Sequence, residues 1–469
     1  MISLTLGELA AAVGGTILNG DPEFVVEGGA QVRVDSRFVG AGDVFICQVG
    51  ESTDGHLYAP SAAEAGAAAL IVERSLEVSV PQVLVADAHA ALQELARFVV
   101  ARVRRSGLLS VVGITGSNGK TTTKNMVREI VERVGPTVAP QGSFNNRVGA
   151  PLSMLAVDEA TRFLVVELGA SGPGEISGLA SIAVPDVAAV LTVGLAHVGG
   201  FGGIESTRSS KAELVQSLTS GGVAVLNADD PRVTTMSELT DARVVRYGTV
   251  AAADVRASDI ETSLDGTRFV LHADGARHPV KLKLVGEHQV VNALAAVAIA
   301  RELGVDVTAA ITALETMDRA EKYRMEVHRL GSGVTLVNDA YNASPDSMAA
   351  ALKTLAQVTR NTGRSVAVLG EMAELDDESD PEHDRLGRLA VRLNIQRLIV
   401  VGHRARHIHN AAGLEGSWDG ESVLVDTVDE AYDLLRDELR AGDVVLVKSS
   451  NSAGLRFLGD RLVETGGVS

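Results

Sequence analysis

The chain has 469 residues, which is enough for two to four domains with large buried cores. Hydrophobic residues make up 46% of it and aromatic residues only 3%, a composition typical of layered α/β domains. The formal net charge of −18, without any basic stretch, excludes binding to a nucleic-acid backbone as the main activity.

The single cysteine excludes an internal disulfide. Cys47 lies in the apolar run VFIC, so we expect a small core residue rather than a nucleophile. No stretch approaches 18 uninterrupted apolar residues, and the N-terminus lacks a basic segment followed by an apolar one. We therefore expect a soluble, cytoplasmic protein whose partners include neither a membrane nor nucleic acid.

The first predicted unit, residues 1–106, has short strands and helices and ends in a helix over residues 89–105. From residue 107, strand-like runs alternate with helical stretches, which predicts a mostly parallel sheet with helices on both faces. The runs cover residues 108–114, 163–168, 187–193 and 223–228. A helix over 288–304, closing at a glycine, is the last strong element before residue 322.

The alternation of strand-like and helical segments is interrupted near residues 317–327 and resumes in the last third of the chain. Its strand-like runs are VTLVNDAY, SVAVLGE, RLIVVGH and VVLVKSS. This predicts a second doubly wound α/β unit, in which ligands bind at the carboxyl ends of the strands. Three polar residues lie at such ends: Asp339, Asn342 and Lys448.

The glycine-rich stretch GITGSNGKTTT, residues 113–123, lies between a predicted strand and a predicted helix. That setting is typical of a phosphate-binding loop, although the strict spacing G-x-x-x-x-G-K-[ST] needs a glycine where Ile114 stands. Backbone N–H groups and the helix dipole would face an anion, and Lys120 would reach the outer phosphates. Thr121 falls where such loops supply a Mg²⁺ ligand. The alternative is a plain strand–helix turn with a stray lysine.

Polar residues at other predicted strand ends are candidate cation ligands beside this loop. Glu167 ends the strand at 163–168, and His197 follows the strand at 187–193. Each has a structural alternative, a helix-capping carboxylate for Glu167 and a solvated loop histidine for His197. Lys211, at a helix start in SSKAEL, looks like an ordinary surface lysine on these criteria alone.

Two further clusters of polar residues have mainly structural interpretations. The tract EMAELDDESDPEHD (371–384) holds eight carboxylates without Lys or Arg, so we expect a solvated loop whose His383 could contact a ligand. The three histidines of GHRARHIHN (402–410) have no zinc-binding spacing, and we expect solvated helix surface there.

Several segments, in order, resemble the Mur ligase family. The loop TGSNGKT (115–121) is similar to that family's ATP loop, whose glycine spacing it shares. Other matching segments are VDSRFVGAGDVFI (34–46), DGH (54–56), FNNRVGAPLSML (144–155), ELGASGPGEI (167–176), AHVGGFGGIES (196–206), SKAEL (210–214), GEHQVVNALAA (286–296), DAYNASPDSM (339–348), VLGEMAEL (368–375) and LVKSSNSA (446–453). Together they span nearly the whole chain, and the closest resemblance is to the branch that adds D-alanyl-D-alanine.

This resemblance implies a three-domain α/β architecture. The N-terminal domain (1–106) would bind the UDP substrate, and the central P-loop domain (107–322) would bind ATP on a mostly parallel sheet. A C-terminal Rossmann-like domain (323–469) would bind nucleotide and the incoming dipeptide. The implied reaction is ATP-dependent joining of D-Ala-D-Ala to UDP-N-acetylmuramoyl-tripeptide through an acyl phosphate. It is the last cytoplasmic step of peptidoglycan-precursor synthesis, and we expect a monomer to carry it out.

The resemblance also implies roles for individual residues around ATP and two Mg²⁺ ions. The ATP phosphates would lie on Thr115, Gly116, Ser117, Asn118, Gly119, Lys120 and Thr121. Thr121, Glu167 and His197 would surround the magnesium ions. Lys211 matches a lysine that the family typically converts with CO₂ to a carbamate, an anionic metal ligand. His288 and Asn292 would border the adenine, while Arg324, Asp339 and Tyr341 would reach the nucleotide from the C-terminal domain.

Substrate contacts are implied at Ser36 and Arg37 for the UDP part, and at Asn145, Asn146 and Arg147 along the sugar-peptide path. Asn342 and His383 are the candidate contacts in the C-terminal domain. The chain departs from the family at Ser344, often Asn, and at Ser449-Ser450-Asn451, often Gly-Ser-Arg, both near the expected dipeptide pocket.

Three alternatives remain at this stage. A sibling ligase, either diamino-acid-adding or a folylpolyglutamate synthase, would share the P-loop, but the Asn-Pro-Arg signature of the diamino-acid branch is absent. A GTPase-type switch should carry an N-K-x-D sequence, and the dipeptide Asn-Lys does not occur. A non-catalytic nucleotide-binding scaffold would not need Lys120, Glu167 and His197 together.

Overall fold

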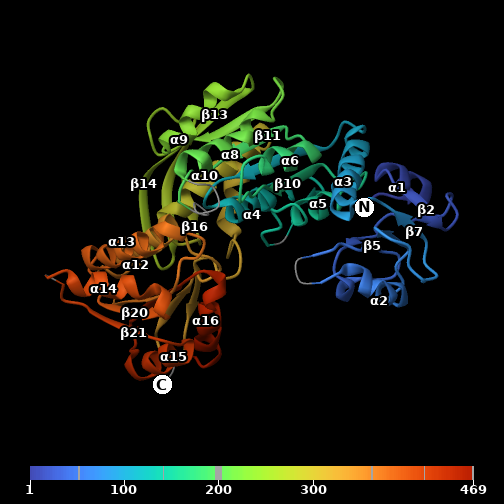
Figure 1. The fold of residues 1–469 in the computed structure, drawn as a ribbon. Helices are drawn as coiled ribbons and strands as arrows, with labels where there is room; N and C mark the ends of the chain where they lie inside the picture. Colours follow the sequence, from blue (N-terminus) through green and yellow to red (C-terminus); the bar gives the residue numbers. More distant parts are fainter. Residues whose placement is uncertain (51–52, 141, 196–202, 361–362, 417, 467–469) are drawn as a thin grey trace.

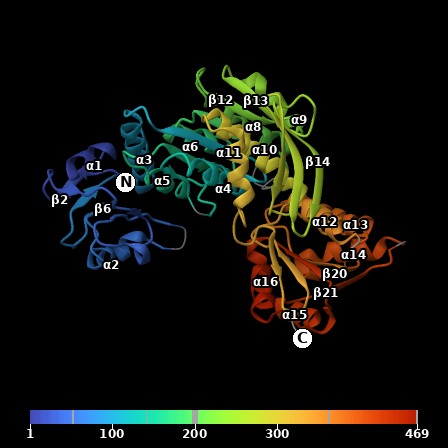
Figure 2. The ribbon, with the colours of Figure 1, turned by 180° about the vertical axis from the view of Figure 1, so that it is seen from behind.

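The computed structural model describes residues 1–469 except 51–52, 141, 196–202, 361–362, 417 and 467–469. Three sheet-based units follow one another in space as in sequence, with the N-terminal and C-terminal units at opposite ends of the central one (Figures 1 and 2). None of the described helices is long and apolar enough to cross a membrane.

The N-terminal unit has a five-stranded sheet in which only the edge strand β2 runs antiparallel to its neighbour. The strand order is β2 (Thr16–Asn19), β7 (Gln82–Leu84), β6 (Ala69–Val72), β5 (Val44–Ile46) and β4 (Val32–Arg33). Two short strands, β1 (Leu4–Thr5) and β3 (Val25–Val26), form a separate pair. The helices are α1 (Leu6–Ala12), α2 (Ala59–Glu64) and α3 (Ala88–Arg104).

Helix α3 confirms the predicted helix over residues 89–105 and joins two units. Asp87 caps its N-terminus by accepting from the N–H groups of His89 and Ala90. Its buried face, which includes Leu92, Leu95 and Val99, belongs to a core cluster that also contains residues of the central sheet. The first unit is therefore packed directly onto the second rather than tethered by an exposed linker.

The central unit is built on a nine-stranded sheet, parallel from β9 to β14 and extended by an antiparallel meander, β14 to β16. The strand order is β16 (Ala276–Leu282), β15 (Gly266–Ala273), β14 (Val255–Ser263), β13 (Arg243–Gly248), β12 (Val223–Asn227), β11 (Val187–Val190), β8 (Ser110–Thr115), β10 (Phe163–Glu167) and β9 (Thr137–Val138). The prediction of a mostly parallel sheet with helices on both faces is confirmed.

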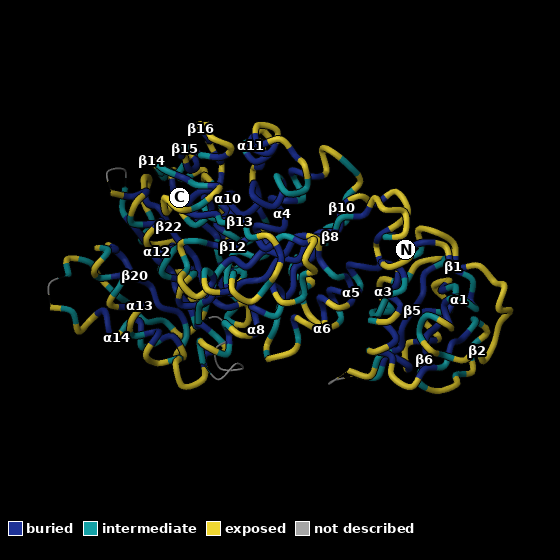
Figure 3. Tube along the Cα trace, turned by 90° about the horizontal axis from the view of Figure 1, so that it is seen from above, coloured by how far each residue is buried: buried dark blue, intermediate teal, exposed yellow. Residues whose placement is uncertain are grey.

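Alternation along β8 shows how the sheet is covered. Val111 belongs to the core cluster beneath α3, and Val112 and Ile114 belong to the cluster on the opposite face. The helices of the central unit are α4 (Lys120–Val131), α5 (Gly149–Met154), α6 (Glu175–Ile182), α8 (Ile204–Gln216), α9 (Pro231–Thr234), α10 (Glu287–Glu302) and α11 (Val307–Thr316). Helix α10, predicted at 288–304, is buried on nearly every side because it packs against α4, α11 and several strands (Figure 3).

The C-terminal unit is a second doubly wound sheet, as predicted, with one antiparallel edge strand, β17. The order is β17 (Glu326–Arg329), β18 (Thr335–Asn338), β22 (Val444–Lys448), β19 (Ser365–Leu369), β20 (Arg397–Val401) and β21 (Glu421–Val425). The helices are α12 (Pro345–Thr359), α13 (Ser379–Arg392), α14 (Arg406–Leu414), α15 (Val428–Glu438) and α16 (Leu455–Glu464).

The acidic tract at 371–384 is not the solvated loop that its composition predicted. A 3₁₀ turn spans Asp376–Glu378, and α13 begins at Ser379. Asp380 and Glu382 lie in the first turn of α13, where the positive end of the helix dipole stabilises carboxylates. The negative charge that argued for a loop therefore favours a helix start.

Candidate functional site

One large cavity, about 890 Å³, lies where the central and C-terminal units meet. The phosphate-loop residues Ser117 to Thr121 line it together with residues at the carboxyl ends of strands in both sheets. Parallel strands β10, β8 and β11 are neighbours, so their ends converge on one edge, as expected for a ligand site in an α/β sheet.

The phosphate loop is fixed by hydrogen bonds to the end of the neighbouring strand. Ser117 N and Asn118 N donate to Thr192 O (2.8 Å) and Thr192 Oγ1 (3.1 Å). Strand β11 therefore ends at Val190, earlier than predicted, because the following residues leave the sheet to hold this loop. Gly119 has φ +85°, and a Cβ there would collide with the Asn292 side chain, so the position requires glycine.

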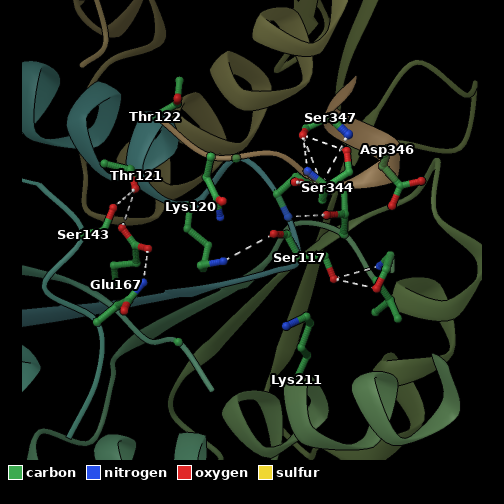
Figure 4. Close-up of a pocket in the computed structure, with 18 of the residues that line it drawn as sticks. Ser117, Lys120, Thr121, Thr122, Ser143, Glu167, Lys211, Ser344, Asp346 and Ser347 are labelled. Carbon is green, nitrogen blue, oxygen red and sulfur yellow. Dashed lines mark hydrogen bonds between the residues drawn. The ribbon is translucent and has the colours of Figure 1, made fainter. Parts of the chain in front are cut away.

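The Lys120 ammonium folds back over the loop, donating to Gly116 O at 2.7 Å. It also donates to Ser117 O at 3.4 Å (Figure 4). Burial lowers its pKa, although the nearby Glu167 carboxylate acts in the opposite direction. An anion bound in the loop would offer this partly buried cation a better partner than a neutral carbonyl.

A hydrogen-bonded cluster connects the start of α4 to the end of β10. The Thr121 hydroxyl donates to Glu167 Oε2 (2.9 Å), and Asn145 Nδ2 donates to Glu167 Oε1 (2.6 Å). Thr121 also contacts Ser143 Oγ at 3.0 Å and accepts from Arg324 Nη2 at 3.1 Å. Hydroxyl and carboxylate oxygens are thus brought together beside the phosphate loop, as the sequence predicted for Thr121 and Glu167.

Lys211 is buried, not a surface residue. It lies on α8, only 3% exposed, and extends toward the space below the phosphate loop (Figure 4). Burial, with Lys120 as a second cause, lowers its pKa to about 7. A large fraction of the side chain is therefore the neutral amine at neutral pH, the form that can react with CO₂.

The C-terminal unit contributes its own residues to the cavity wall. The Arg324 guanidinium stacks on the Tyr341 ring, 4.3 Å from the centroid. Asp339 accepts from Lys448 Nζ (2.6 Å) and from Met325 N (3.0 Å), so its carboxylate is already paired with a buried cation. Asn342 also lines the cavity, and its carbonyl accepts from Lys448.

Four residues of α10 line the cavity: His288, Gln289, Val291 and Asn292. The Asn292 amide donates to Gln289 Oε1 (3.2 Å), and Thr123 Oγ1 donates to Asn292 Oδ1 (3.5 Å). Burial lowers the pKa of His288, which keeps the imidazole neutral. A neutral ring and an amide are suited to an uncharged, planar group rather than to a phosphate.

Family models match three consecutive parts of the chain. The Mur ligase family, catalytic domain, matches residues 30–112; the Mur ligase middle domain matches 114–300; the Mur ligase, glutamate ligase domain, matches 323–451. The chain belongs to the Mur ligase family.

Full-length relatives support this assignment. The UDP-N-acetylmuramoyl-tripeptide--D-alanyl-D-alanine ligase of Mycobacterium tuberculosis is 43% identical, covering 99% of this chain and 98% of its own length. The Escherichia coli enzyme of the same name is 33% identical over 99% of this chain and its whole length. A MurF crystal structure from Acinetobacter baumannii matches with a TM-score of 0.89 at 31% identity, covering 98% of this chain and 99% of its own.

A MurF ligase from Thermotoga maritima, solved in complex with ADP, is also similar. Its TM-score is 0.81 at 29% identity, and the match covers 93% of this chain and 98% of that one. ATP use by this Mur ligase, predicted from the phosphate loop, is thereby supported at the level of the family.

In this Mur ligase, Asn145, Asn146 and Arg147 also line the cavity. Asn146 Oδ1 accepts from Gly149 N at 2.8 Å and so shapes the turn into α5. The Arg147 side chain is 68% exposed and lies 3.4 Å from Glu175. Arg147 is thus free enough to follow a ligand, whereas Asn145 and Asn146 are held in place.

Not every predicted site residue of the Mur ligase lies at this cavity. Ser36 and Arg37 belong to the N-terminal unit, where the Arg37 side chain is 81% exposed and paired with Asp35. His197 lies outside the described residues. His383, a predicted substrate contact, is wholly buried on α13.

The prediction for His383 is corrected by its hydrogen bonds. Its Nε2 accepts from Met372 N (2.9 Å), and Nδ1 lies 2.6 Å from Ser379 O. Both ring nitrogens are therefore used by the backbone. Burial lowers the pKa of His383, consistent with a neutral structural imidazole.

The described residues fit a magnesium ion in part. No group of three or more His, Cys, Asp or Glu side chains gathers as a metal site within the described ranges. Thr121 and Glu167 supply adjacent oxygen atoms of the kind Mg²⁺ prefers, and Lys211 faces the same space.

Sequence reasoning missed two residues. Ser143 contacts Thr121 Oγ1, and Lys124 donates to the carbonyls of Pro140 and Gly142. Lys124 carried a readable signal, because it shares a helical face with Val127 and Val131, at spacings of three and seven residues. A lysine on the apolar face of a predicted helix indicates a buried side chain with a hydrogen-bond partner. Ser143, in a loop, carried no comparable signal.

Proposed function

We propose that this Mur ligase joins D-alanyl-D-alanine to UDP-N-acetylmuramoyl-tripeptide, converting ATP to ADP and phosphate. The observation that carries the proposal is 43% identity, over nearly the full length of both chains, to the M. tuberculosis ligase of that name. The reaction would be the last cytoplasmic step toward UDP-MurNAc-pentapeptide, and we propose a cytoplasmic monomer as the active form.

The chemistry proceeds in two steps. The terminal carboxylate of the tripeptide attacks the γ-phosphorus of ATP, giving an acyl phosphate and ADP. The free amine of D-Ala-D-Ala then attacks the acyl carbon, the new amide forms, and inorganic phosphate leaves with the C–O bond electrons. The first step brings a carboxylate and a triphosphate together, so charge neutralisation is the main requirement.

The phosphate loop, Thr115–Thr121, meets part of this requirement. Its backbone N–H groups lie at the N-terminus of α4, and the Lys120 amine needs only to turn from Gly116 O toward a bound phosphate. Lys120 then stabilises charge that develops on the transferred phosphoryl group.

We propose that Thr121, Glu167, His197 and a carbamylated Lys211 hold two Mg²⁺ ions. When bound, these ions would neutralise the phosphate oxygens and the attacking carboxylate. The burial of Lys211 and its low pKa support carbamylation, because the reaction with CO₂ consumes a neutral amine.

The other site residues are proposed to bind and orient. His288 and Asn292 border the adenine, while Arg324, Asp339 and Tyr341 reach the nucleotide from the C-terminal unit. Asn145, Asn146, Arg147 and Asn342 follow the peptide, and Ser36 with Arg37 contacts the UDP part. We also propose domain boundaries near residues 106 and 322, because the five-, nine- and six-stranded sheets fall on different sides of them.

The decisive assay is ATP-dependent phosphate release with UDP-MurNAc-tripeptide and different amine substrates. D-Ala-D-Ala should stimulate release strongly, whereas single D-alanine, a diamino acid or glutamate should not. Stimulation by a diamino acid or by glutamate would instead assign the chain to a sibling ligase. Phosphate release independent of any amine would contradict ligation altogether.

A further inference from the structure

Helix α4 carries a lysine inside the protein, one turn beyond Lys120. Lys124 has no exposed surface, and burial lowers its pKa to about 8. Its Nζ donates to Gly142 O (2.6 Å) and to Pro140 O. A buried amine retained at such a position binds a specific partner, because burying it unpaired is costly.

Lys124 bonds to the start of a short segment, residues 142–146, which we call the asparagine loop. The loop has a second attachment through Glu321, whose carboxylate accepts from Gly142 N (3.3 Å). Glu321 also accepts from the Asn125 amide (3.2 Å), next to Lys124 on α4. Lys124 directly, and Asn125 through Glu321, therefore fix the same end of this loop.

The asparagine loop in turn presents two side chains to the proposed magnesium ligands. Ser143 Oγ lies 3.0 Å from Thr121 Oγ1, and Asn145 Nδ2 donates to Glu167 Oε1 at 2.6 Å. Lys124 does not itself line the cavity within the described residues, although Ser143 and Asn145 do. Its influence on the site therefore passes through the loop.

We propose that Lys124 is a positioning residue for magnesium binding. By clamping the carbonyls of Pro140 and Gly142, it holds the asparagine loop so that Ser143 and Asn145 orient Thr121 and Glu167. The proposal rests on the proposed function, because it assumes that Thr121 and Glu167 bind the metal. Residues that orient metal ligands typically affect metal affinity by about 10- to 100-fold when removed.

The test measures ADP binding by calorimetry, with and without Mg²⁺, in full-length Lys124→Met. The methionine keeps most of the apolar stem and removes the ammonium. We expect ADP affinity in Mg²⁺ to fall about tenfold, with a much smaller change when Mg²⁺ is absent. Arg128→Met, which removes another cation from the same helix, is the matched control and should leave both affinities within about twofold.

A double-mutant cycle separates positioning from general destabilisation. If Lys124 acts through Asn145, then Lys124→Met combined with Asn145→Ala should lose little more affinity than the worse single variant. Amide hydrogen exchange at residues 142–147 should also be faster in Lys124→Met. Fully additive losses, or a loss of ADP affinity independent of Mg²⁺, would overturn the proposal.

Lys124→Gln covers the case in which the methionine variant does not fold. Glutamine keeps an N–H₂ donor group on a shorter, uncharged side chain, so its Mg²⁺-dependent affinity should lie between those of wild type and of Asn145→Ala. An affinity equal to wild type would overturn the proposal. If wild type itself shows no Mg²⁺-dependent ADP binding, the proposed function fails instead, and the two failures are thereby distinguished.

Discussion

Two lysines, the buried Lys211 and the partly buried Lys120, set the electrostatics of the site at the scale of single residues. Each faces the same cavity, and the charge of Lys120 contributes to the low pKa of Lys211. Two ammonium groups here would repel each other and any magnesium ion. A division of roles, with Lys120 as the cation and Lys211 as the precursor of an anion, removes this conflict.

Lys120→Ala should abolish turnover while the protein remains folded, because the side chain contacts loop carbonyls and not a hydrophobic core. The measurement is kcat at saturating substrates, with the melting temperature as the control for folding. Retention of more than about a tenth of wild-type kcat, equivalent to about 1.4 kcal/mol of barrier, would contradict the assigned role.

Lys211→Ala should be nearly inactive, and acetate should restore part of its activity by placing a carboxylate in the vacated space. Lys211→Arg keeps a positive charge but cannot form a carbamate, so it should stay inactive with or without acetate. The measurement is phosphate release across an acetate titration. Full activity in the arginine variant would show that a cation, not a carbamate, is needed at this position.

The limits of sequence reasoning are clearest at this scale. Lys211 and His383 both looked like polar residues near solvent, yet both are buried. Burial depends on which helix face meets the core. Lys211 shares its face of α8 with Leu214 and Val215, and His383 shares its face of α13 with Leu386, so the apolar spacing already indicated burial. Only the family resemblance predicted a functional role for Lys211. His383 was predicted to contact a ligand, but the backbone occupies both of its ring nitrogens.

At the scale of elements, one helix start links the C-terminal unit to the phosphate loop. Ser344 caps α12 through a reciprocal capping box with Ser347, and its hydroxyl donates to Asn118 Oδ1 at 2.9 Å. A hydroxyl can both cap a helix and donate to a neighbouring side chain, so Ser344 joins the start of α12 to the phosphate loop.

Ser344→Ala should lower the free energy of unfolding by about 1 kcal/mol through loss of the cap. It should also raise the KM for ATP, because Asn118 in the phosphate loop loses a partner. Ser347→Ala, which disrupts the same cap without touching Asn118, should destabilise similarly with a smaller effect on KM. Chemical denaturation and initial rates measure the two effects. Equal KM changes in the two variants would show that the contact with Asn118 has no role.

At this scale, the sequence also contains a turn signal for the antiparallel part of the central sheet. The antiparallel meander from β14 to β16 has Asp274-Gly275 at one turn, with φ of 51° and 76°. Two successive positive φ values are typical of tight hairpin turns, and Asp-Gly is a favoured pair there. The parallel strands were easier to predict because their continuous apolar runs stand out from the alternating pattern of a half-exposed hairpin.

At the scale of the whole molecule, three sheet units lie in a row (Figure 1). The cavity lies at one junction of this row, between the central and C-terminal units. The two doubly wound sheets could be predicted from alternating strand and helix patterns. Their relative placement could not, because it depends on single contacts such as Arg324 with Thr121 and Ser344 with Asn118. Such contacts join residues more than 200 positions apart and leave no periodic pattern in the sequence.

The central claim is that the tripeptide carboxylate is activated by ATP and then joined to D-Ala-D-Ala. Its most direct test labels both oxygens of the terminal tripeptide carboxylate with ¹⁸O and follows product and phosphate by mass spectrometry. One labelled oxygen should appear in inorganic phosphate and the other in the new amide of UDP-MurNAc-pentapeptide. Pentapeptide formed without label in the phosphate, or labelled phosphate without pentapeptide, would contradict the account.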